Sequence, residues 1–290
     1  MGSRRPYTER FATVPARVDV TRSEIGFAHL HWSGRPVRIE YQWLGAPAGG
    51  STPLIVFLHE GLGSLAMWRE FPQALCDAAH CRGLVYSRPG YGRSTPREAG
   101  DAWGVDFMHA QASEVLPALL DALGVDAAAQ PLWLFGHSDG GSIALLYAAK
   151  NVDRVAGAIV VAPHIVVEAI SVQSIMKARD VYLHTDLRQR LARYHDDPDS
   201  AFWGWNRVWL LPEFRGRSIA SEIRSIVCPL LAAQGVNDEY GTLEQIRGIA
   251  RLVSQTELLE LPDCAHSPHR DKPDVLIAAA REFIGKHKAA

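Results

Sequence analysis

The chain has 290 residues, a length that suits one large α/β domain with an inserted segment. Hydrophobic residues make up 47% and charged residues 21%, which is typical of a globular protein with a substantial core. Because the formal net charge is only -2, we expect no nucleic-acid partner.

The N-terminus is basic, but no apolar segment follows it, so it does not resemble a secretory signal. No apolar run approaches the roughly 20 residues that span a bilayer. The four cysteines stand at spacings that suggest neither a zinc site nor a disulfide framework. We therefore expect a cytoplasmic protein with no membrane span and no metal. The sequence carries no signal for the oligomeric state.

The predicted elements begin with a hairpin and continue as alternating strands and helices. Two alternating segments, residues 26–32 and 37–43, lead into the sheet, and a turn at residues 45–52 follows them. Apolar runs typical of buried parallel strands occupy residues 54–58, 83–86, 132–135, 155–161, 228–233 and 256–261. Helical patterns occupy residues 66–79, 107–123, 138–150, 243–253 and 274–285, and Thr242 and Gln245 have the spacing of a capping box. We expect an α/β fold with a mostly parallel, doubly wound sheet.

The alternation stops once, between residues 164 and 225, where helix-like sequence runs for about sixty residues without a strand pattern. We predict a helical cap at residues 164–225, inserted into a core domain of residues 1–163 and 226–290. The segment contains Trp203, Trp205 and Trp209. Tryptophans of this kind are more often packing anchors than substrate contacts, and both interpretations stand.

The sharpest local signal is Gly136-His137-Ser138-Asp139-Gly140, which lies between an apolar strand pattern and a helical one. A tight turn in this context exposes the serine hydroxyl, and small residues on either side let strand and helix approach closely. The start of the helix directs peptide N–H groups to the place where an oxyanion would develop. We therefore predict that Ser138 is a nucleophile.

A serine hydroxyl needs a general base and a group that orients this base. Asp238 follows one buried strand pattern, and His266 follows the next. Because parallel strands end at the same edge of a sheet, we expect the three side chains to converge. His266 would take the proton of Ser138, while Asp238 would fix the tautomer of the imidazole.

Neighbouring residues offer alternatives for two of these roles. Glu239 is the alternative to Asp238, and His269 is the alternative to His266. His164, which opens the predicted cap, is interpreted as a histidine of the pocket wall or the core.

A glycine-rich turn at residues 59–64, with the sequence HEGLGS, follows the first buried strand pattern. Such a turn can direct a backbone N–H at a substrate oxygen. We predict an oxyanion hole made by the N–H groups of Gly61 and Asp139, with Leu62 as the alternative to Gly61, and each donor contributes roughly 3 kcal/mol. The predicted substrate pocket contains Glu60, Leu62, His137, His164, Trp205 and Trp209.

With these features the chain resembles the α/β-hydrolase superfamily from about residue 26 to residue 284. The resemblance rests on GHSDGG at residues 136–141, the turn at residues 59–64, the RPGYGRS loop at residues 88–94, Asp238 and His266. It implies a serine hydrolase of this fold that needs neither a metal nor an organic cofactor.

Two residues depart from the pattern of the superfamily. Glu60 stands where many relatives have glycine, and a carboxylate near an oxyanion hole would oppose the developing charge. We therefore expect the Glu60 side chain to face inward or towards a basic partner. Asp139 adds a second negative charge beside the nucleophile, either as a local hydrogen-bond acceptor or as a specificity residue.

The resemblance implies cleavage of a carboxylic ester through a tetrahedral intermediate and an acyl-enzyme. The aromatic and aliphatic cap favours a small-molecule acyl substrate that is apolar or aromatic. Hydrolysis of a carbon–carbon bond, a lactone or a thioester remains an alternative, and Arg88, Arg93 or Arg207 would anchor a substrate carboxylate if they are not merely surface residues. A ligand sensor that keeps the fold without turnover is the alternative of another class.

Overall fold

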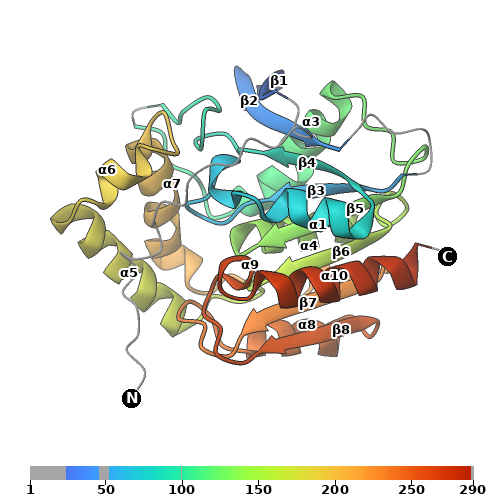
Figure 1. The fold of residues 1–290 in the computed structure, drawn as a ribbon. Helices are drawn as coiled ribbons and strands as arrows, with labels where there is room; N and C mark the ends of the chain where they lie inside the picture. Colours follow the sequence, from blue (N-terminus) through green and yellow to red (C-terminus); the bar gives the residue numbers. More distant parts are fainter. Residues whose placement is uncertain (1–23, 46–51, 99, 289–290) are drawn as a thin grey trace.

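The computed structural model describes residues 24–45, 52–98 and 100–288, and these form a sheet of eight strands with helices on both faces (Figure 1). In chain order the strands are β1 (Gly26–Trp32), β2 (Arg35–Leu44), β3 (Leu54–Leu58), β4 (Arg82–Tyr86), β5 (Leu132–His137), β6 (Gly157–Val161), β7 (Leu230–Gly235) and β8 (Thr256–Leu261). In space the order is β1-β2-β4-β3-β5-β6-β7-β8. Strands β1 and β2 and strands β2 and β4 pair antiparallel, and all later pairs are parallel. The predicted α/β class and mostly parallel sheet are confirmed.

The helices cover the sheet in two layers. They are α1 (Phe71–Ala79), α2 (Phe107–Ala110), α3 (Leu116–Ala122), α4 (Asp139–Lys150), α5 (Ala169–His184), α6 (Leu187–Leu191), α7 (Pro198–Leu210), α8 (Glu244–Leu252), α9 (Pro268–Asp271) and α10 (Pro273–His287). Helices α1 and α10 pack together on one face, and α4 lies on the other with α2, α3 and α8 (Figure 1). This doubly wound arrangement is also as predicted. Within the described part of the chain, no helix combines the length and the apolar character needed to span a bilayer.

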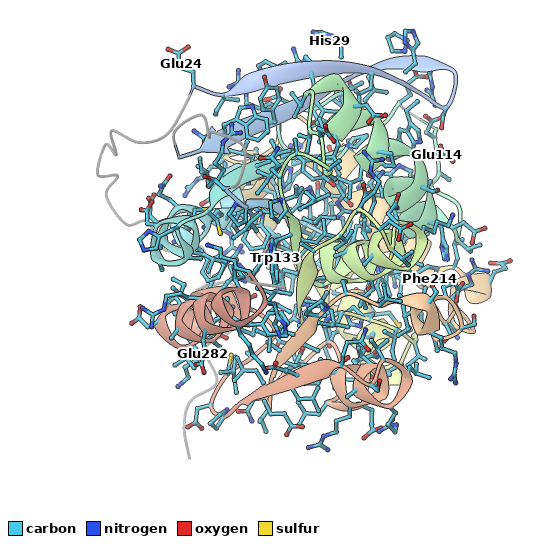
Figure 2. All side chains as sticks on the ribbon, turned by 90° about the vertical axis from the view of Figure 1, so that its right-hand side faces the viewer. Glu24, His29, Glu114, Trp133, Phe214 and Glu282 are labelled. Atoms are coloured by element: carbon cyan, nitrogen blue, oxygen red, sulfur yellow. The ribbon has the colours of Figure 1, made fainter. Side chains whose placement is uncertain are left out.

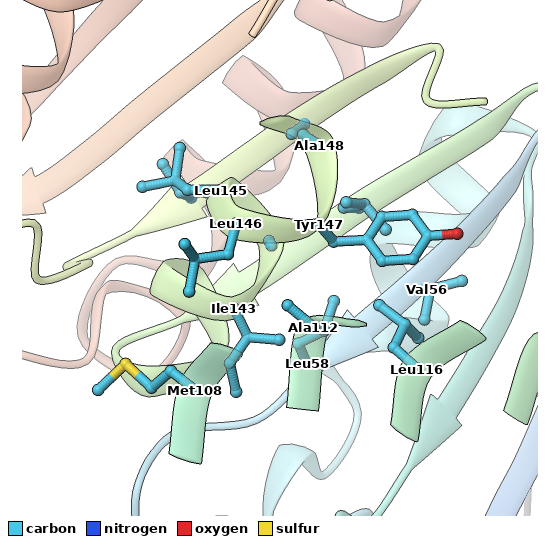
Figure 3. Packing of buried hydrophobic residues seen from close by; sticks show 14 of the residues in the cluster. Val56, Leu58, Met108, Ala112, Leu116, Ile143, Leu145, Leu146, Tyr147 and Ala148 are labelled. Carbon is cyan, nitrogen blue, oxygen red and sulfur yellow. The ribbon is translucent and has the colours of Figure 1, made fainter. Parts of the chain in front are cut away.

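The central strands are buried on both faces, and their residues alternate between two apolar clusters. On β3, Ile55 and Phe57 join the cluster of α1 and α10, whereas Val56 and Leu58 join that of α4 and α3 (Figure 3). Figure 2 shows Trp133 of β5 in the interior, between the layers. The strand ends are therefore fixed by packing on both sides.

Two predicted helices are interrupted. The one expected at residues 66–79 begins as a 3₁₀ turn, η2 (Ala66–Trp68), and stops at Arg69, whose φ of 55° is incompatible with a helix. The one expected at residues 107–123 contains a π-helical turn, η3 (Gln111–Val115). Helix α3 starts at Leu116 as a separate helix, because Pro117 in its first turn has no N–H to donate to the preceding turn. The other predicted elements are confirmed within a few residues, except that the turn at residues 45–52 lies largely outside the described residues.

The predicted capping box of Thr242 and Gln245 is wrong. Helix α8 begins at Glu244, and the hydroxyl of Thr242 accepts from the N–H of Glu244, at 3.3 Å, whereas a capping box would require the N–H of Gln245. Thr242 instead donates to Glu168 through both its N–H, at 2.9 Å, and its hydroxyl, at 2.6 Å. The amide of Gln245 also donates to Glu168, at 2.7 Å. These side chains therefore connect the turn after β7 to the segment after β6.

Residues 164–225, between β6 and β7, contain α5, α6 and α7, which lie beside the sheet (Figure 1). Two 3₁₀ turns, η4 (Pro212–Phe214) and η5 (Glu222–Ser225), follow α7. Val166 and Ser218 form an isolated antiparallel bridge within the segment. Turn η5 contacts α4 and α8, so the end of the segment packs on the helices of the sheet.

Candidate active site

Ser138 occupies the turn between β5 and α4, with φ 53° and ψ -120°. This backbone conformation is strained for a residue with a side chain, and it persists because the surrounding packing imposes it. A Cβ atom on Gly136 would lie 2.2 Å from the carbonyl oxygen of Gly140, and one on Gly140 would lie 2.0 Å from that of Leu58. Strand and helix thus approach too closely for any side chain at either position.

Ser138, His266 and Asp238 are hydrogen-bonded in series. The hydroxyl of Ser138 lies 3.0 Å from Nε2 of His266, and Nδ1 of His266 lies 2.8 Å and 3.0 Å from the carboxylate oxygens of Asp238. Because an ionised carboxylate only accepts, Nδ1 carries the proton and Nε2 accepts from the hydroxyl. This geometry can transfer the serine proton to the imidazole.

The environment of Asp238 keeps its carboxylate ionised. The carboxylate also accepts from the N–H of Tyr240, at 2.8 Å, and from the side-chain amide of Gln234, at 3.1 Å. Burial alone would raise the pKa of Asp238, but the charge and the hydrogen bond of His266 outweigh it and lower the pKa. The negative charge beside the imidazole is therefore retained at neutral pH.

Glu239 and His269 lie elsewhere. Glu239 accepts from the backbone N–H of His266 at 3.2 Å, so its carboxylate contacts the main chain of that residue, whereas Asp238 contacts the ring. His269 is buried, with its ring centroid 4.7 Å from that of His137. It is not among the residues that line the cavity at Ser138.

The turn after β3 is held by His59. Its Nδ1 donates to the carbonyl oxygen of Glu60 at 2.7 Å, and its Nε2 accepts from the N–H of Arg88 at 3.0 Å. Burial and the charge of Arg88 hold the pKa of His59 well below its usual value, so the ring is neutral. No role was predicted for His59 from the sequence, although its place directly after a buried strand was a usable signal.

Gly61 and Leu62, the two candidate oxyanion donors of this turn, line the same cavity as Ser138 and Asp139. A Cβ atom on Gly61 would lie 2.2 Å from Nε1 of Trp205. The tryptophan thus packs directly on the glycine main chain, and any larger residue at position 61 would displace it.

Glu60 faces basic partners. Its Oε1 accepts from the Arg270 guanidinium at 3.2 Å, and its Oε2 lies 3.5 Å from Nδ1 of His137. Burial would raise the pKa of Glu60, but the neighbouring His137 and the charge of Arg270 hold it well below its usual value. His137 in turn donates from Nε2 to the carbonyl oxygen of His266 at 2.7 Å. The predicted pocket residues Glu60 and His137 therefore also support the turn that carries His266.

Asp139 is fully buried beside Ser138. Its Oδ1 accepts from Nε1 of Trp209 at 3.1 Å, and its Oδ2 lies 3.8 Å from the guanidinium of Arg88. Burial, only partly offset by Arg88 and Trp209, raises the pKa of Asp139 to about 6. The interpretation of Arg88 as a surface residue is wrong, because its side chain is fully buried and also donates to the carbonyl oxygen of Glu60 at 2.9 Å.

The cavity at Ser138 encloses about 610 Å³, including the space that opens to solvent. The predicted residues Glu60, Gly61, Leu62, His137, Ser138, Asp139, His164, Trp205, Trp209 and His266 line it. Met67, Ile175, Tyr240, Ser267 and Arg270 complete the lining and were missed. Tyr240 and Arg270 could have been predicted as lining residues, because they stand close to Asp238 and His266 in the sequence. Met67 and Ile175 carry no such signal.

The arginines proposed as carboxylate anchors are not in this lining. Arg88 is buried behind Asp139, and Arg93 and Arg207 are exposed. His164 is part of the wall, with its ring centroid 5.9 Å from that of His266, and burial lowers its pKa to about 3. Among the described residues, no group of three or more histidine, cysteine, aspartate or glutamate side chains is placed to hold a metal ion.

Comparison with known proteins agrees with this architecture. Residues 53–202, which are 150 of the 290 residues, match the family model of the alpha/beta hydrolase fold. The sn-1-specific diacylglycerol lipase ABHD11 of Mus musculus is 25% identical over 280 residues, with 86% of each chain covered. Protein phosphatase methylesterase 1 of Bos taurus is 29% identical over 104 residues, or 36% of this chain. The match spans about a quarter of the methylesterase, 26% of its length.

Solved structures share the fold over nearly the whole chain. A carboxylesterase structure from Nitrososphaera gargenis has a TM-score of 0.72 at 17% identity and covers 90% of this chain and 99% of that one. The enol-lactonase from Burkholderia xenovorans LB400 has a TM-score of 0.68 at 20% identity and covers 90% and 100%. At these identities the likeness shows the fold alone. Since the family model matches more than half of its residues, the chain belongs to the alpha/beta hydrolase fold family.

Proposed function

We propose that this protein is a serine hydrolase that cleaves a carboxylic ester, with Ser138 as the nucleophile, His266 as the general base and Asp238 as the residue that orients the base. One observation carries the proposal. The hydrogen-bonded series from Ser138 to Asp238 lies in a cavity and leaves Nε2 of His266 as an acceptor for the serine proton. Membership of the alpha/beta hydrolase fold family supports it.

In the proposed reaction, Oγ of Ser138 attacks the ester carbonyl carbon while Nε2 of His266 takes the hydroxyl proton. The oxyanion that forms accepts hydrogen bonds from the N–H groups of Gly61 and Asp139. The bond to the alcohol oxygen then breaks, and His266 returns the proton to the departing alcohol. Water, deprotonated by His266, attacks the acyl-enzyme and releases the acid, so that Ser138 recovers its proton.

Residues 164–225 act in this proposal as a cap. Two of its side chains support the role: Trp205 packs on Gly61, and Trp209 bonds to Asp139. The cap thus touches both residues whose N–H groups would form the oxyanion hole. Its contribution to the cavity wall is mainly apolar, which favours an apolar or aromatic acyl group.

A cytoplasmic location is part of the proposal. It rests on the cysteines: Cys76, Cys81, Cys228 and Cys264 are all buried, and no disulfide joins them. Proteins of an oxidising compartment more often pair such residues.

A fluorophosphonate probe and p-nitrophenyl esters of increasing chain length test the proposed function. Wild-type protein should be labelled and should turn over the esters, and Ser138→Ala should lose labelling and at least about 10⁴-fold in kcat. Ser267→Ala is the matched control, because this serine lines the same cavity. The variant should still be labelled. A folded wild-type protein that is neither labelled nor active would contradict the proposal, as would labelling that survives Ser138→Ala.

A further inference from the structure

A second cavity adjoins the one at Ser138. It encloses about 360 Å³, including the space that opens to solvent. Its lining is mostly apolar and includes Val105, Met108, Ile165, Val167, Phe214 and Ile219. His164 and Trp209 line both cavities, so these two side chains form the partition between them.

The partition is held in place. Nε1 of Trp209 donates to Asp139 at 3.1 Å, and the indole centroid lies 5.0 Å from that of His164 and 4.9 Å from that of Phe214. The main chain of His164 is fixed by Ser142, whose hydroxyl contacts its carbonyl oxygen at 2.8 Å and its N–H at 3.0 Å. Trp209 is 1% exposed. The indole is therefore a fixed wall between the nucleophile turn and the second cavity.

The chemistry of the second cavity suits a hydrocarbon chain. Two charged or titratable side chains in its lining have acidic partners: Arg217 pairs with Asp106, and His109 lies 3.4 Å from Glu222. The remaining lining offers mainly aliphatic and aromatic surface. Burial of one methylene group on such surface strengthens binding by about fourfold.

We propose that Trp209 sets the longest alkyl chain that the cavity at Ser138 accepts, and that the second cavity receives the chain end once the indole is removed. The inference rests on the proposed function, since the chain is that of an ester bound with its carbonyl group at Ser138. It makes Trp209 a specificity-determining residue.

The test uses protein that carries Ser138→Ala, so that esters bind without being cleaved. Calorimetry gives dissociation constants for methyl esters of linear acids and, separately, for acetate esters of linear alcohols. With Trp209 present, affinity should rise with chain length to a limit. Trp209→Ala should extend that limit in one of the two series, and each additional methylene should tighten binding by about fourfold. The series that responds identifies which side of the ester faces the partition.

Three further variants make the test specific. Trp203→Ala, on the same helix, is the matched control, because Trp203 lines neither cavity and should leave the limit unchanged. Trp209→Leu is a milder truncation should the alanine variant fail to fold, and it should extend the limit less. Val167→Phe partly fills the second cavity. In combination with Trp209→Ala, this substitution should return the chain-length limit to its wild-type value. On its own it should leave the chain-length limit unchanged.

An unchanged limit in folded Trp209→Ala or Trp209→Leu protein would overturn the inference. An extension that survives Val167→Phe would also overturn it, because the space of the indole alone would then hold the chain. Turnover of these esters by protein with Ser138 intact separates the two proposals. Turnover with an unchanged limit refutes the inference and leaves the proposed function standing, whereas neither binding nor turnover refutes both.

Discussion

Two regions meet at the cavity, and they contribute to it in different ways. The edge of the sheet contributes polar side chains from turns that follow parallel strands, and packing at the strand ends fixes each turn. The segment of residues 164–225 contributes mainly bulky apolar side chains from helices. The polar set is Ser138, Asp238 and His266, and the apolar set is Ile175, Trp205 and Trp209.

The difference teaches where each property of the site is encoded. In the proposed reaction, side chains at the sheet edge exchange protons, so substitutions there should change the rate of the chemical step. The helical segment contacts turns of the sheet edge from outside; Trp205 packs on Gly61, and Trp209 donates to Asp139. Substitutions in that segment should change which ligands bind and how firmly the turns are held.

The largest effect is expected at the sheet edge, for Asp238→Asn. An amide no longer fixes the Nδ1–H tautomer of His266, so kcat should fall by about 10⁴-fold. Glu239→Gln is the matched control, because a glutamine oxygen can still accept from the backbone N–H of His266. Its kcat should fall less than tenfold, measured on the same p-nitrophenyl ester. Equal losses in the two variants would show that Asp238 has no special role.

The next largest effect is expected on the free energy of unfolding. Urea unfolding measures it for a substitution at one glycine from each region. Gly140→Ala places a methyl group 2.0 Å from the carbonyl oxygen of Leu58, so it should lower the free energy of unfolding by about 3 kcal/mol or more. Gly216→Ala, in the helical segment, meets no atom within 4 Å and should change it by less than about 0.5 kcal/mol. Similar free energies of unfolding for Gly140→Ala and Gly216→Ala would mean that the turn at Ser138 can relax around the added methyl group.

The sheet edge was largely predictable from the sequence. A parallel strand ends where its apolar run ends, and neighbouring parallel strands end at one edge, so Ser138, Asp238 and His266 were expected to converge before any contact was known. The structure places them in hydrogen-bonded contact. The glycines around Ser138 were also informative, because the close approach of a strand and the helix that follows it requires small residues at the turn.

The helical segment was far less predictable. Trp205 and Trp209 are four residues apart on α7 and share a face, whereas Trp203 lies on another, and this spacing was a signal that sequence analysis did not use. Contacts between distant segments left no signal at all. Arg88 is buried near Asp139, which follows a different strand, and Thr242 donates to Glu168, which lies in the segment after β6.

A third effect concerns Asp139, where the two regions touch. Its pKa is raised from 3.8 to about 6, so the folded state binds this proton more tightly than the unfolded state. Ionisation between about pH 4 and pH 7 therefore lowers the free energy of unfolding, by about 3 kcal/mol for a difference of this size. Asp139→Asn removes this loss. Its stability relative to wild type should rise across that range in urea unfolding.

Asp153→Asn, at an exposed position, is the control for this pH dependence. Its stability relative to wild type should change little over the same range. If the free energy of unfolding of Asp139→Asn relative to wild type also stayed constant over this pH range, the carboxyl group of Asp139 would titrate at an ordinary pKa despite its burial.

The smallest effect is expected at His195, between α6 and α7, which links the helical segment to the turn after β3. Its Nδ1 accepts from the N–H of Gly92 at 2.9 Å, and its Nε2 donates to the carbonyl oxygen of Leu62 at 3.2 Å. Burial lowers the pKa of His195 to about 4, so the neutral ring keeps both bonds at neutral pH. His195→Ala should cost about 1–2 kcal/mol of stability, because two main-chain groups lose their partner.

The same substitution should lower kcat about tenfold and change KM little, since the turn it loosens also carries Gly61, which contacts the substrate in the proposed reaction only as charge develops. His195→Gln can again offer one acceptor and one donor, so it should recover most of kcat. Lost stability with an unchanged kcat in His195→Ala would show that His195 only packs. Recovery of both stability and kcat in His195→Gln would show that the helical segment, which exchanges no protons in the proposed reaction, helps to set the rate through the main chain it holds.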